Sequence, residues 1–492
     1  MRRILIVLVL MASHHVNSKC QFYENQNLLM NIEDYPTIFE LNLGEQFQYK
    51  RLINDQVIEY EIKLIKIKPN YSSYFWNLDD GNHGKDSIFH SAKISLEING
   101  QLVEIDHRPF EFPVTLGGIR LYIEAVKEWA IGGDLADLKR MEKDARFSIC
   151  LAKETWGSKN IKYPIANYKF KSSSYNNTWG SLVPYAPLYY HKGEDMGAIP
   201  DRFPVSSPIS GEIIGWPGSK GDGLSNGIII KDINGIVFRL AHMNAEHIRN
   251  DLKIGDFINS GDFLGFTGST WLGGRNQTHD PHFHVEMWYI NKTDTIHISP
   301  YPYLVEAYFR MYSDPVLAIA GNYEWTTPGE LVYLDGNRSI VRSGEKIKSY
   351  KWILHNDSIV NEAQTSIRFT QPGLYTQELV VETHNGEIDR DFVQVRVWDS
   401  SKTFDNIRDI AFGWVYHYPV RNVKIGDPVL FWNRIHNTMK SVFIDFGDGT
   451  PPVKFYNSIA HPYLAEGSYV VRIWGYGPRN EPFIYKLEVV VE

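Results

Sequence analysis

Cysteine is scarce in this chain, since only Cys20 and Cys150 occur among 492 residues. This scarcity excludes a disulfide scaffold, an iron–sulfur cluster and a zinc site built on three or four thiolates. Any metal ion must therefore be held mainly by histidines and carboxylates. The two cysteines can form at most one disulfide, and we expect that such a bond would pin the N-terminal segment.

The chain also lacks a surplus of positive charge. Lysine and arginine number 50 against 58 aspartates and glutamates, which gives a formal net charge of -8. A chain of this charge presents no general electrostatic attraction for a phosphate backbone or an anionic membrane. We therefore expect no nucleic-acid partner. Aromatic residues make up 14% of the chain, which is too many for a disordered protein.

No run of about 18 apolar residues occurs, so the sequence predicts no transmembrane helix. The first three residues carry two arginines and lead into the apolar run Ile4–Ala12, which is the pattern of a secretory signal peptide. Val16 and Ser18 satisfy the small-residue cleavage rule, so residues 1–18 are the predicted signal peptide. Lys19 disfavours a lipoprotein with Cys20 lipidated. We expect a secreted, periplasmic or cell-surface protein.

The length predicts about three or four cores at roughly 100–200 residues each, and the expected fold class is mainly β and multidomain. Residues 19–165 form a β-rich module with a hairpin at Asn99-Gly100 and one short helix that carries Leu135, Leu138 and Met141. Its role stays open between ligand or wall binding and a structural or autoinhibitory pro-domain. The polar stretch 171–180 has the composition of a linker.

The rest of the chain is predicted to be β as well. Residues 181–305 form a segment rich in glycine and histidine, expected to be an antiparallel β domain. After Pro315, strands separated by turns at Asn385-Gly386 and Asp448-Gly449 predict two C-terminal immunoglobulin-like β-sandwiches, at 315–398 and 402–492.

Five residues of the middle segment stand apart among 17 histidines and many carboxylates. His191 and Asp195 are separated by glycine-containing sequence that favours a loop or strand end over a helix. From His282 to Trp288 polar and apolar residues alternate, so His282, His284 and Glu286 share one face of a strand. Asn234-Gly235 predicts a type I′ hairpin whose second strand leads to His242. We expect these pieces to lie on adjacent strands of one sheet.

Imidazole and carboxylate together suit zinc. A catalytic zinc takes three protein ligands and leaves the fourth tetrahedral position for water. His191, Asp195 and one histidine of the His282/His284 pair supply three ligands, and the other two histidines are then available for acid–base work. Bound zinc lowers the pKa of its water from 15.7 to about 7 and polarises a carbonyl. The pattern predicts hydrolysis without a protein nucleophile, with one zinc ion per chain.

These motifs resemble, in order and spacing, those of the lysostaphin/LytM-type zinc endopeptidases. The resemblance rests on the run from His191 to Asp195, residues 204–215, Ala241-His242-Met243, residues 252–268 and His282-Phe283-His284. It implies that zinc is bound by His191, Asp195 and His284. It also implies that His242 and His282 orient the water, act as general base and stabilise the tetrahedral intermediate. The usual substrates of the family are peptide cross-bridges or stems of peptidoglycan, so the expected partner is a cell-wall peptide or protein.

Two departures concern the rim of the expected cleft. Asp280-Pro281 replaces the small residues that precede the family's His-x-His motif and follows a longer loop, Trp271–His279, and Phe283 replaces the usual leucine. His279 is a candidate extra rim contact. The substrate is therefore less well specified than the chemistry.

The C-terminal motifs resemble polycystic-kidney-disease (PKD) repeats. The second copy carries Asp445–Thr450, His461–Tyr463 and Gly467–Ile473, and a first copy is suggested by Leu334–Gly336, Tyr350–Trp352 and Phe369–Tyr375. Such modules imply either spacers or binders of polysaccharide or protein. A second class of function follows from them: a cell-surface adhesion or wall-binding protein whose peptidase-like domain is inactive.

Overall fold

The computed structural model describes residues 27–77, 83–127, 129, 141–174, 177–183, 189–216, 226–270, 281–291, 295–321, 323–397, 411, 413–435 and 439–492. Strands dominate these residues, in several mostly antiparallel sheets with separate hydrophobic cores. The expected fold class, mainly β and multidomain, is confirmed. The predicted signal peptide, Cys20, Leu135, Leu138 and His279 lie outside the described residues. None of the helices among the described residues is long and apolar enough to span a membrane.

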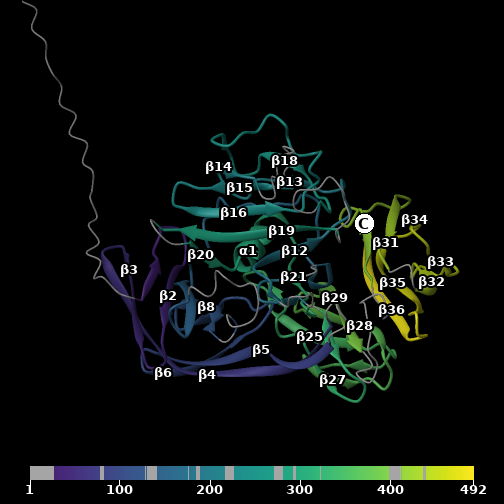
Figure 1. Ribbon diagram of the computed structural model, residues 1–492, viewed down its shortest axis with the longest axis horizontal. Helices are drawn as coiled ribbons and strands as arrows, with labels where there is room; N and C mark the ends of the chain where they lie inside the picture. The colour runs from purple at the N-terminus through teal and green to yellow at the C-terminus, as the bar shows by residue number, and fades with distance from the viewer. Residues whose placement is uncertain are drawn as a thin grey trace, which may run out of the picture.

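The N-terminal module consists of two sheets, drawn in purple and blue in Figure 1. Five strands pair in the order β1-β2-β9-β8-β7 and four in the order β3-β4-β5-β6. The Asn99-Gly100 turn joins β5 to β6 as predicted, and both turn residues have positive φ, at 49° and 80°. The bounds are β1 (Leu28–Met30), β2 (Thr37–Leu41), β3 (Gln46–Ile53), β4 (Gln56–Asn77), β5 (His83–Ile98), β6 (Gln101–His107), β7 (Val114–Leu116), β8 (Ile119–Val126) and β9 (Ala145–Leu151).

The central domain is built on one antiparallel sheet in the order β12-β19-β16-β15-β14-β17, with β20 also paired to β19. Two short strand pairs, β10-β11 and β13-β18, lie outside this sheet. The bounds are β10 (Leu182–Val183), β11 (Tyr189–Tyr190), β12 (Gly193–Gly197), β13 (Pro204–Ser206), β14 (Gly211–Gly215), β15 (Ile228–Lys231), β16 (Ile236–Ala241), β17 (Phe257–Ile258), β18 (Phe263–Phe266), β19 (His282–Ile290) and β20 (Thr295–Ile298).

The hairpin between β15 and β16 differs from the predicted type I′ turn. Such a turn needs positive φ at both central residues, but only Gly235 of the Asn234-Gly235 pair has it, at 89°. The Asp232 side chain instead accepts hydrogen bonds from the backbone N–H groups of Asn234 and Ile236, each at 2.8 Å. This wider turn still pairs the strands and directs the chain toward His242.

One hydrophobic core joins the N-terminal module to the central domain. Helix α1 (Tyr301–Met311) packs its buried tyrosines against both parts, so that Tyr303 meets Tyr35 and Trp156 at ring distances of 6.3 and 6.4 Å. Cys150 in β9 is buried in this region and forms no disulfide with any described residue. Because Cys20 is not described, the disulfide between the two stays a prediction.

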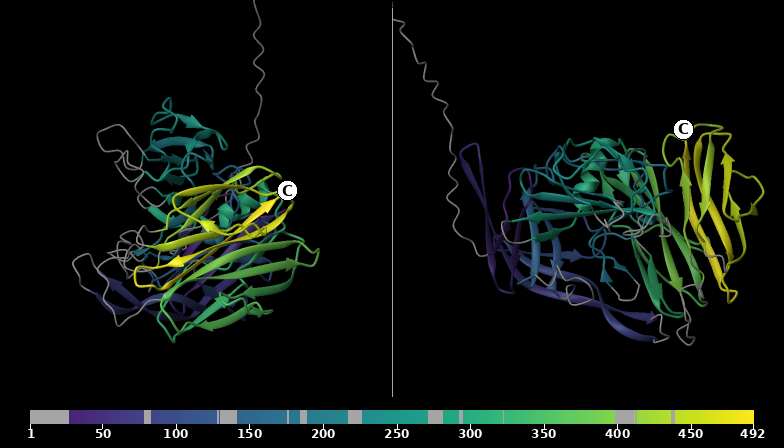
Figure 2. Two further views of the ribbon diagram at one scale, coloured as in Figure 1. Left: turned by 90° about the vertical axis from the view of Figure 1, so that its right-hand side faces the viewer. Right: turned by 45° about the horizontal axis from the view of Figure 1, so that its top comes forward.

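The C-terminal part forms two sandwiches joined through one continuous sheet (Figure 2). β28 of the first sandwich pairs in parallel with β36 of the second, and each sandwich has its own core. The first comprises β21 (Val316–Leu317), β22 (Glu324–Thr326), β23 (Leu331–Asp335), β24 (Ile340–Val341), β25 (Ile347–Ile353), β26 (Ile359–Val360), β27 (Gln364–Arg368), β28 (Gly373–Thr383) and β29 (Ile388–Val397). The second comprises β30 (Val415–Tyr418), β31 (Pro428–Asn433), β32 (Lys440–Asp445), β33 (Val453–Lys454), β34 (Ser458–Pro462), β35 (Gly467–Tyr476) and β36 (Pro482–Val491).

The stretch expected to be a linker is packed into the molecule. It includes a short 3-10 helix (Ser172–Ser174), and Lys171, Ser172, Asn177, Thr178 and Trp179 are buried. The linker prediction is therefore wrong for the described residues of 171–180. Short polar residues are typical of linkers, but here they are buried because their hydrogen-bonding groups find partners on other parts of the chain.

Candidate metal centre

Three neighbouring strands bring the predicted site residues together. β19 lies between β12 and β16, and His284 is paired with Asp195 on one side and with Ala241 on the other. His242 follows Ala241 directly. Because side chains alternate along a strand, His282 and His284 lie on one face of β19 while Phe283 and Val285 are fully buried on the other. The predicted arrangement on adjacent strands is confirmed.

His191, Asp195 and His284 form a group that can hold a metal ion. His284 Nδ1 lies 2.7 Å from Asp195 Oδ1 and 3.1 Å from His191 Nε2, and His191 Nε2 lies 3.1 Å from Asp195 Oδ1. A tetrahedral zinc with ligand bonds of about 2.1 Å needs donor atoms about 3.4 Å apart. The three atoms form a triangle of nearly that size, so the residues fit zinc.

Gly193 allows this close approach. A Cβ atom at this position would lie 2.4 Å from the backbone oxygen of Val285 and 2.9 Å from the imidazole of His284. Any side chain here would push β12 away from β19 and separate Asp195 from His284. The glycine between the two predicted ligands is therefore needed for the site itself.

Hydrogen bonds fix the orientation of both candidate ligand imidazoles. His191 Nδ1 lies 2.9 Å from the carbonyl oxygen of Gly193, and since a carbonyl only accepts, Nδ1 carries the proton and Nε2 is left for a metal. In His284 the roles are reversed, because its Nε2 lies 3.0 Å from Glu286 Oε1. Glu286 is in turn bonded by Arg239 of β16. Partners of this kind hold a ligand's tautomer and ring plane.

Asp195 is almost completely buried, with 3% of its surface exposed. Burial raises its pKa, but the imidazoles of His191, His282 and His284 outweigh burial and hold the pKa well below its usual value. Its second oxygen, Oδ2, accepts a hydrogen bond of 2.9 Å from Asn177 Nδ2. The carboxylate is therefore ionised, with one oxygen facing the histidines and the other held by an amide.

The remaining two histidines lie beside this group. The rings of His242 and His282 are 4.5 Å apart, and His242 is 5.9 Å from His284. His242 has a φ of 55°, a left-handed conformation that is unusual for a residue with a side chain and is often found at functional sites. Its Nδ1 lies 3.1 Å from the carbonyl oxygen of Thr270, so this nitrogen carries the proton and Nε2 has the lone pair.

The structure thus places all five predicted residues in one cluster. Their individual roles as ligands or acid–base groups stay predictions. Two contributors were not predicted. Glu286 was recognised only as sharing a face with the histidines, and the alternation of β19 is the signal that could have assigned it. Asn177 has no local signal, because its partners lie on other strands.

The fold and the site define a β domain with a group of two histidines and one carboxylate that can hold a metal ion, flanked by two further histidines. Residues 189–297 match the model of peptidase family M23. The chain therefore contains a peptidase family M23 domain, which agrees with the resemblance seen in the motifs. No curated protein matches the chain in sequence.

Solved structures similar to the chain include a putative glycyl-glycine endopeptidase LytM from Ruminococcus gnavus, with 24% identity, a TM-score of 0.24, and coverage of 30% of this chain and 61% of that one. The catalytic domain of the prophage-encoded M23 protein EnpA from Enterococcus faecalis has 26% identity, a TM-score of 0.20 and coverage of 27% and 92%. A zinc-containing peptidase from Vibrio cholerae has 17% identity, a TM-score of 0.21 and coverage of 47% and 85%. The chain thus spans less than two thirds of the LytM structure.

Proposed function

We propose that this protein is an exported zinc-dependent endopeptidase that hydrolyses peptide bonds with a metal-activated water. The observation that carries the proposal is the convergence of His191, Asp195 and His284, with His242 and His282 directly beside them. The family match of residues 189–297 supports it. Export rests on the signal-peptide pattern of residues 1–18.

In this proposal His191 Nε2, Asp195 Oδ1 and His284 Nδ1 would hold one zinc ion. Bound zinc supplies a water with a pKa near 7 and polarises the peptide carbonyl. His242 donates its Nδ1 proton to Thr270, so its Nε2 can accept a proton from the nucleophile and later pass it to the leaving amine. His282 Nε2 lies 3.4 Å from Asp195 Oδ1. A protonated His282 would there stabilise the negative charge of the tetrahedral intermediate.

The proposed substrate is a peptide in peptidoglycan cross-links or a glycine-rich peptide. The motifs that resemble lysostaphin/LytM-type enzymes support this class. The residues before His282 differ from the family pattern, and this difference allows a different sequence preference within this class of substrates. The C-terminal sandwiches would serve as spacers or bind a polysaccharide or protein, and their PKD-like assignment stays a prediction.

The second candidate is an adhesion or wall-binding protein with an inactive peptidase-like domain. The two joined sandwiches make up a large part of the chain and are compatible with binding. Against it stands the placement of His242 and His282, because a purely structural metal site has no use for two further histidines beside its ligands.

The test is digestion of purified peptidoglycan by the full chain, with the released peptides identified by mass spectrometry. We expect defined cleavage products that disappear after chelation and in the His282→Ala variant. Binding to peptidoglycan without any released peptide, at full zinc occupancy, would favour the adhesion protein. A panel of glycine-rich peptides then identifies the scissile bond.

A further inference from the structure

A polar segment links the metal centre to the C-terminal sandwiches. We call the described residues 171–174 and 177–179 the strap. The strap lies beside β12, the edge strand that carries Asp195, and its polar groups are bonded at both ends. It therefore has a defined position between the two parts of the molecule.

One end of the strap is bound to the sandwiches. Lys171 Nζ lies 2.5 Å from Asp389 Oδ1 of β29 and 3.3 Å from Glu488 Oε2 of β36. Burial lowers the pKa of Lys171, but these carboxylates outweigh burial and raise it above its usual value, so the lysine is charged. Ser173 donates to Asp391 Oδ1 from its backbone N–H at 3.1 Å and its hydroxyl at 2.9 Å, and the Ser172 hydroxyl also bonds this carboxylate.

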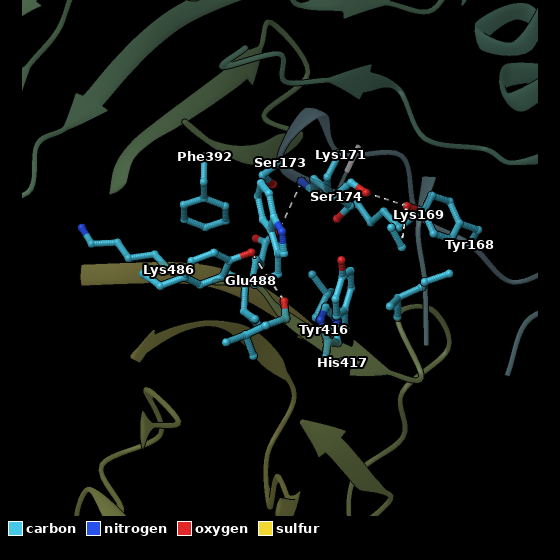
Figure 3. A pocket seen from close by; sticks show the side chains of 18 of the residues that line it. Tyr168, Lys169, Lys171, Ser173, Ser174, Phe392, Tyr416, His417, Lys486 and Glu488 are labelled. Carbon is cyan, nitrogen blue, oxygen red and sulfur yellow. Dashed lines mark hydrogen bonds and ion pairs between the residues drawn. The ribbon is translucent and has the colours of Figure 1, made fainter. Parts of the chain in front are cut away.

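Figure 3 shows this end of the strap from close by. Lys171 and Ser173 line a pocket together with Tyr416, His417 and Glu488 of the second sandwich. Both sandwiches contribute carboxylates to the strap, so a shift of either sandwich relative to the central domain would move it.

The other end of the strap is bound to β12. The Thr178 hydroxyl lies 2.8 and 2.7 Å from the two carboxylate oxygens of Glu194, and the N–H of Trp179 donates to Glu194 Oε1 at 2.9 Å. The N–H of Asp195 donates to the carbonyl oxygen of Asn177 at 2.8 Å. Together with the bond from Asn177 Nδ2 to Asp195 Oδ2, these contacts fix both the backbone and the side chain of the metal ligand.

Tyr323, which directly precedes β22 of the first sandwich, completes the connection. Its hydroxyl donates to Asn177 Oδ1 at 2.9 Å. The amide nitrogen of Asn177 can only donate, and it donates to Asp195 Oδ2. The amide oxygen can only accept, and it faces the Tyr323 hydroxyl. The Tyr323 ring is held 6.2 Å from the ring of Trp325 and 4.5 Å from the guanidinium of Arg396.

We propose that Asn177 and Tyr323 are positioning residues for the metal site, through which the first sandwich orients Asp195. The first sandwich then contributes to the geometry of the metal site, in addition to any role as a spacer or binding module. This inference rests on the proposed metal site. It follows from the chain Tyr323 Oη to Asn177 to Asp195, whose two bonds are both 2.9 Å long.

The test is a double-mutant cycle on the full chain, with zinc affinity measured by competition against a chromophoric chelator. Replacing partners that orient metal ligands typically costs about 10- to 100-fold in affinity. We expect Asn177→Ala to fall in this range and Tyr323→Phe to weaken zinc binding measurably, by up to about tenfold. In the Asn177→Ala background, Tyr323→Phe should have no further effect, because the hydroxyl acts through the amide. The absorption spectrum of the Co²⁺-loaded protein should change in the same pattern.

Tyr333→Phe is the matched control, since this tyrosine of the first sandwich is 75% exposed and lies on β23, where it pairs with Ser366 of β27. Its zinc affinity should equal that of the unaltered chain, and thermal unfolding of the metal-free variants shows whether they fold. Unchanged zinc affinity in folded Tyr323→Phe protein would overturn the proposal, as would equal losses in both backgrounds. The His284→Ala variant distinguishes the proposed metal site from the positioning role. If His284→Ala also keeps zinc, the proposed metal site is wrong. If only His284→Ala loses zinc, the metal site stands and the positioning role of Asn177 and Tyr323 is refuted.

Discussion

Glu286 Oε1 lies 3.0 Å from His284 Nε2, on the side of the imidazole away from Asp195. Burial raises the pKa of Glu286, but the hydrogen bond to His284 and the charge of Arg239 outweigh burial and hold this pKa far below its usual value. The carboxylate is therefore ionised and acts only as an acceptor. It fixes the ring so that Nδ1 faces His191 and Asp195.

Replacing Glu286 by alanine should therefore weaken zinc binding by about 10- to 100-fold without removing a ligand. Zinc affinity measured by chelator competition checks this, with Glu212→Ala as control because Glu212 of β14 is exposed. Equal affinities of the two variants would contradict the orienting role.

The two histidines of β19 should respond differently to substitution. His284→Ala removes one of three ligand atoms and should abolish bound zinc, whereas His282→Ala should keep zinc and lose turnover. Metal emission analysis of the purified unaltered chain should find about one zinc per chain, as expected for a three-ligand site. Equal metal loss from both variants would refute the role assignment.

Glu124 should give the N-terminal module a pH-dependent stability. This carboxyl in β8 is fully buried, and burial raises its pKa from 4.5 to about 7 despite hydrogen bonds from Ser148 and Ser299. Between these two values the folded protein keeps the proton that the unfolded chain has lost. Stability should therefore fall as the pH rises through this window and level off above it, by about 3 kcal/mol in total.

Glu124→Gln should remove this component, because the amide does not titrate. Unfolding of both proteins is to be compared at pH 5 and pH 8. The unaltered chain should lose more stability between these two values than the variant. Identical losses would show that Glu124 does not carry the effect.

Cys150 should be chemically protected in the native protein. Only 2% of its surface is exposed, and burial raises the pKa of its thiol to about 12. Since the thiolate is the reactive form, iodoacetamide at pH 8 should modify Cys150 only after unfolding. Failure of alkylation in denaturant until a reductant is added would instead reveal the predicted disulfide with Cys20, and mass spectrometry distinguishes the outcomes.

Part of the fold could be predicted because its signals are local. The Asn99-Gly100 turn needs two residues that tolerate positive φ, and it was predicted correctly. The Asn234-Gly235 turn was assigned the wrong type, because the side chain of Asp232, which lies outside the two-residue pattern, bonds the backbone and widens the loop.

The sequence by itself determined which side chains are the candidates for the chemistry. Alternation at period two places His282 and His284 on one face of a strand, and the glycines around Asp195 favour a loop or strand end over a helix, so these residues could be recognised without a structure. Only the tertiary structure decided how Asp195 is held. Asn177 and Tyr323 are 146 residues apart, and the strap looks like a linker because its partners Asp389, Asp391 and Glu488 come from distant strands. Burial of a polar segment depends on partners brought together by the whole fold, and no local pattern encodes them.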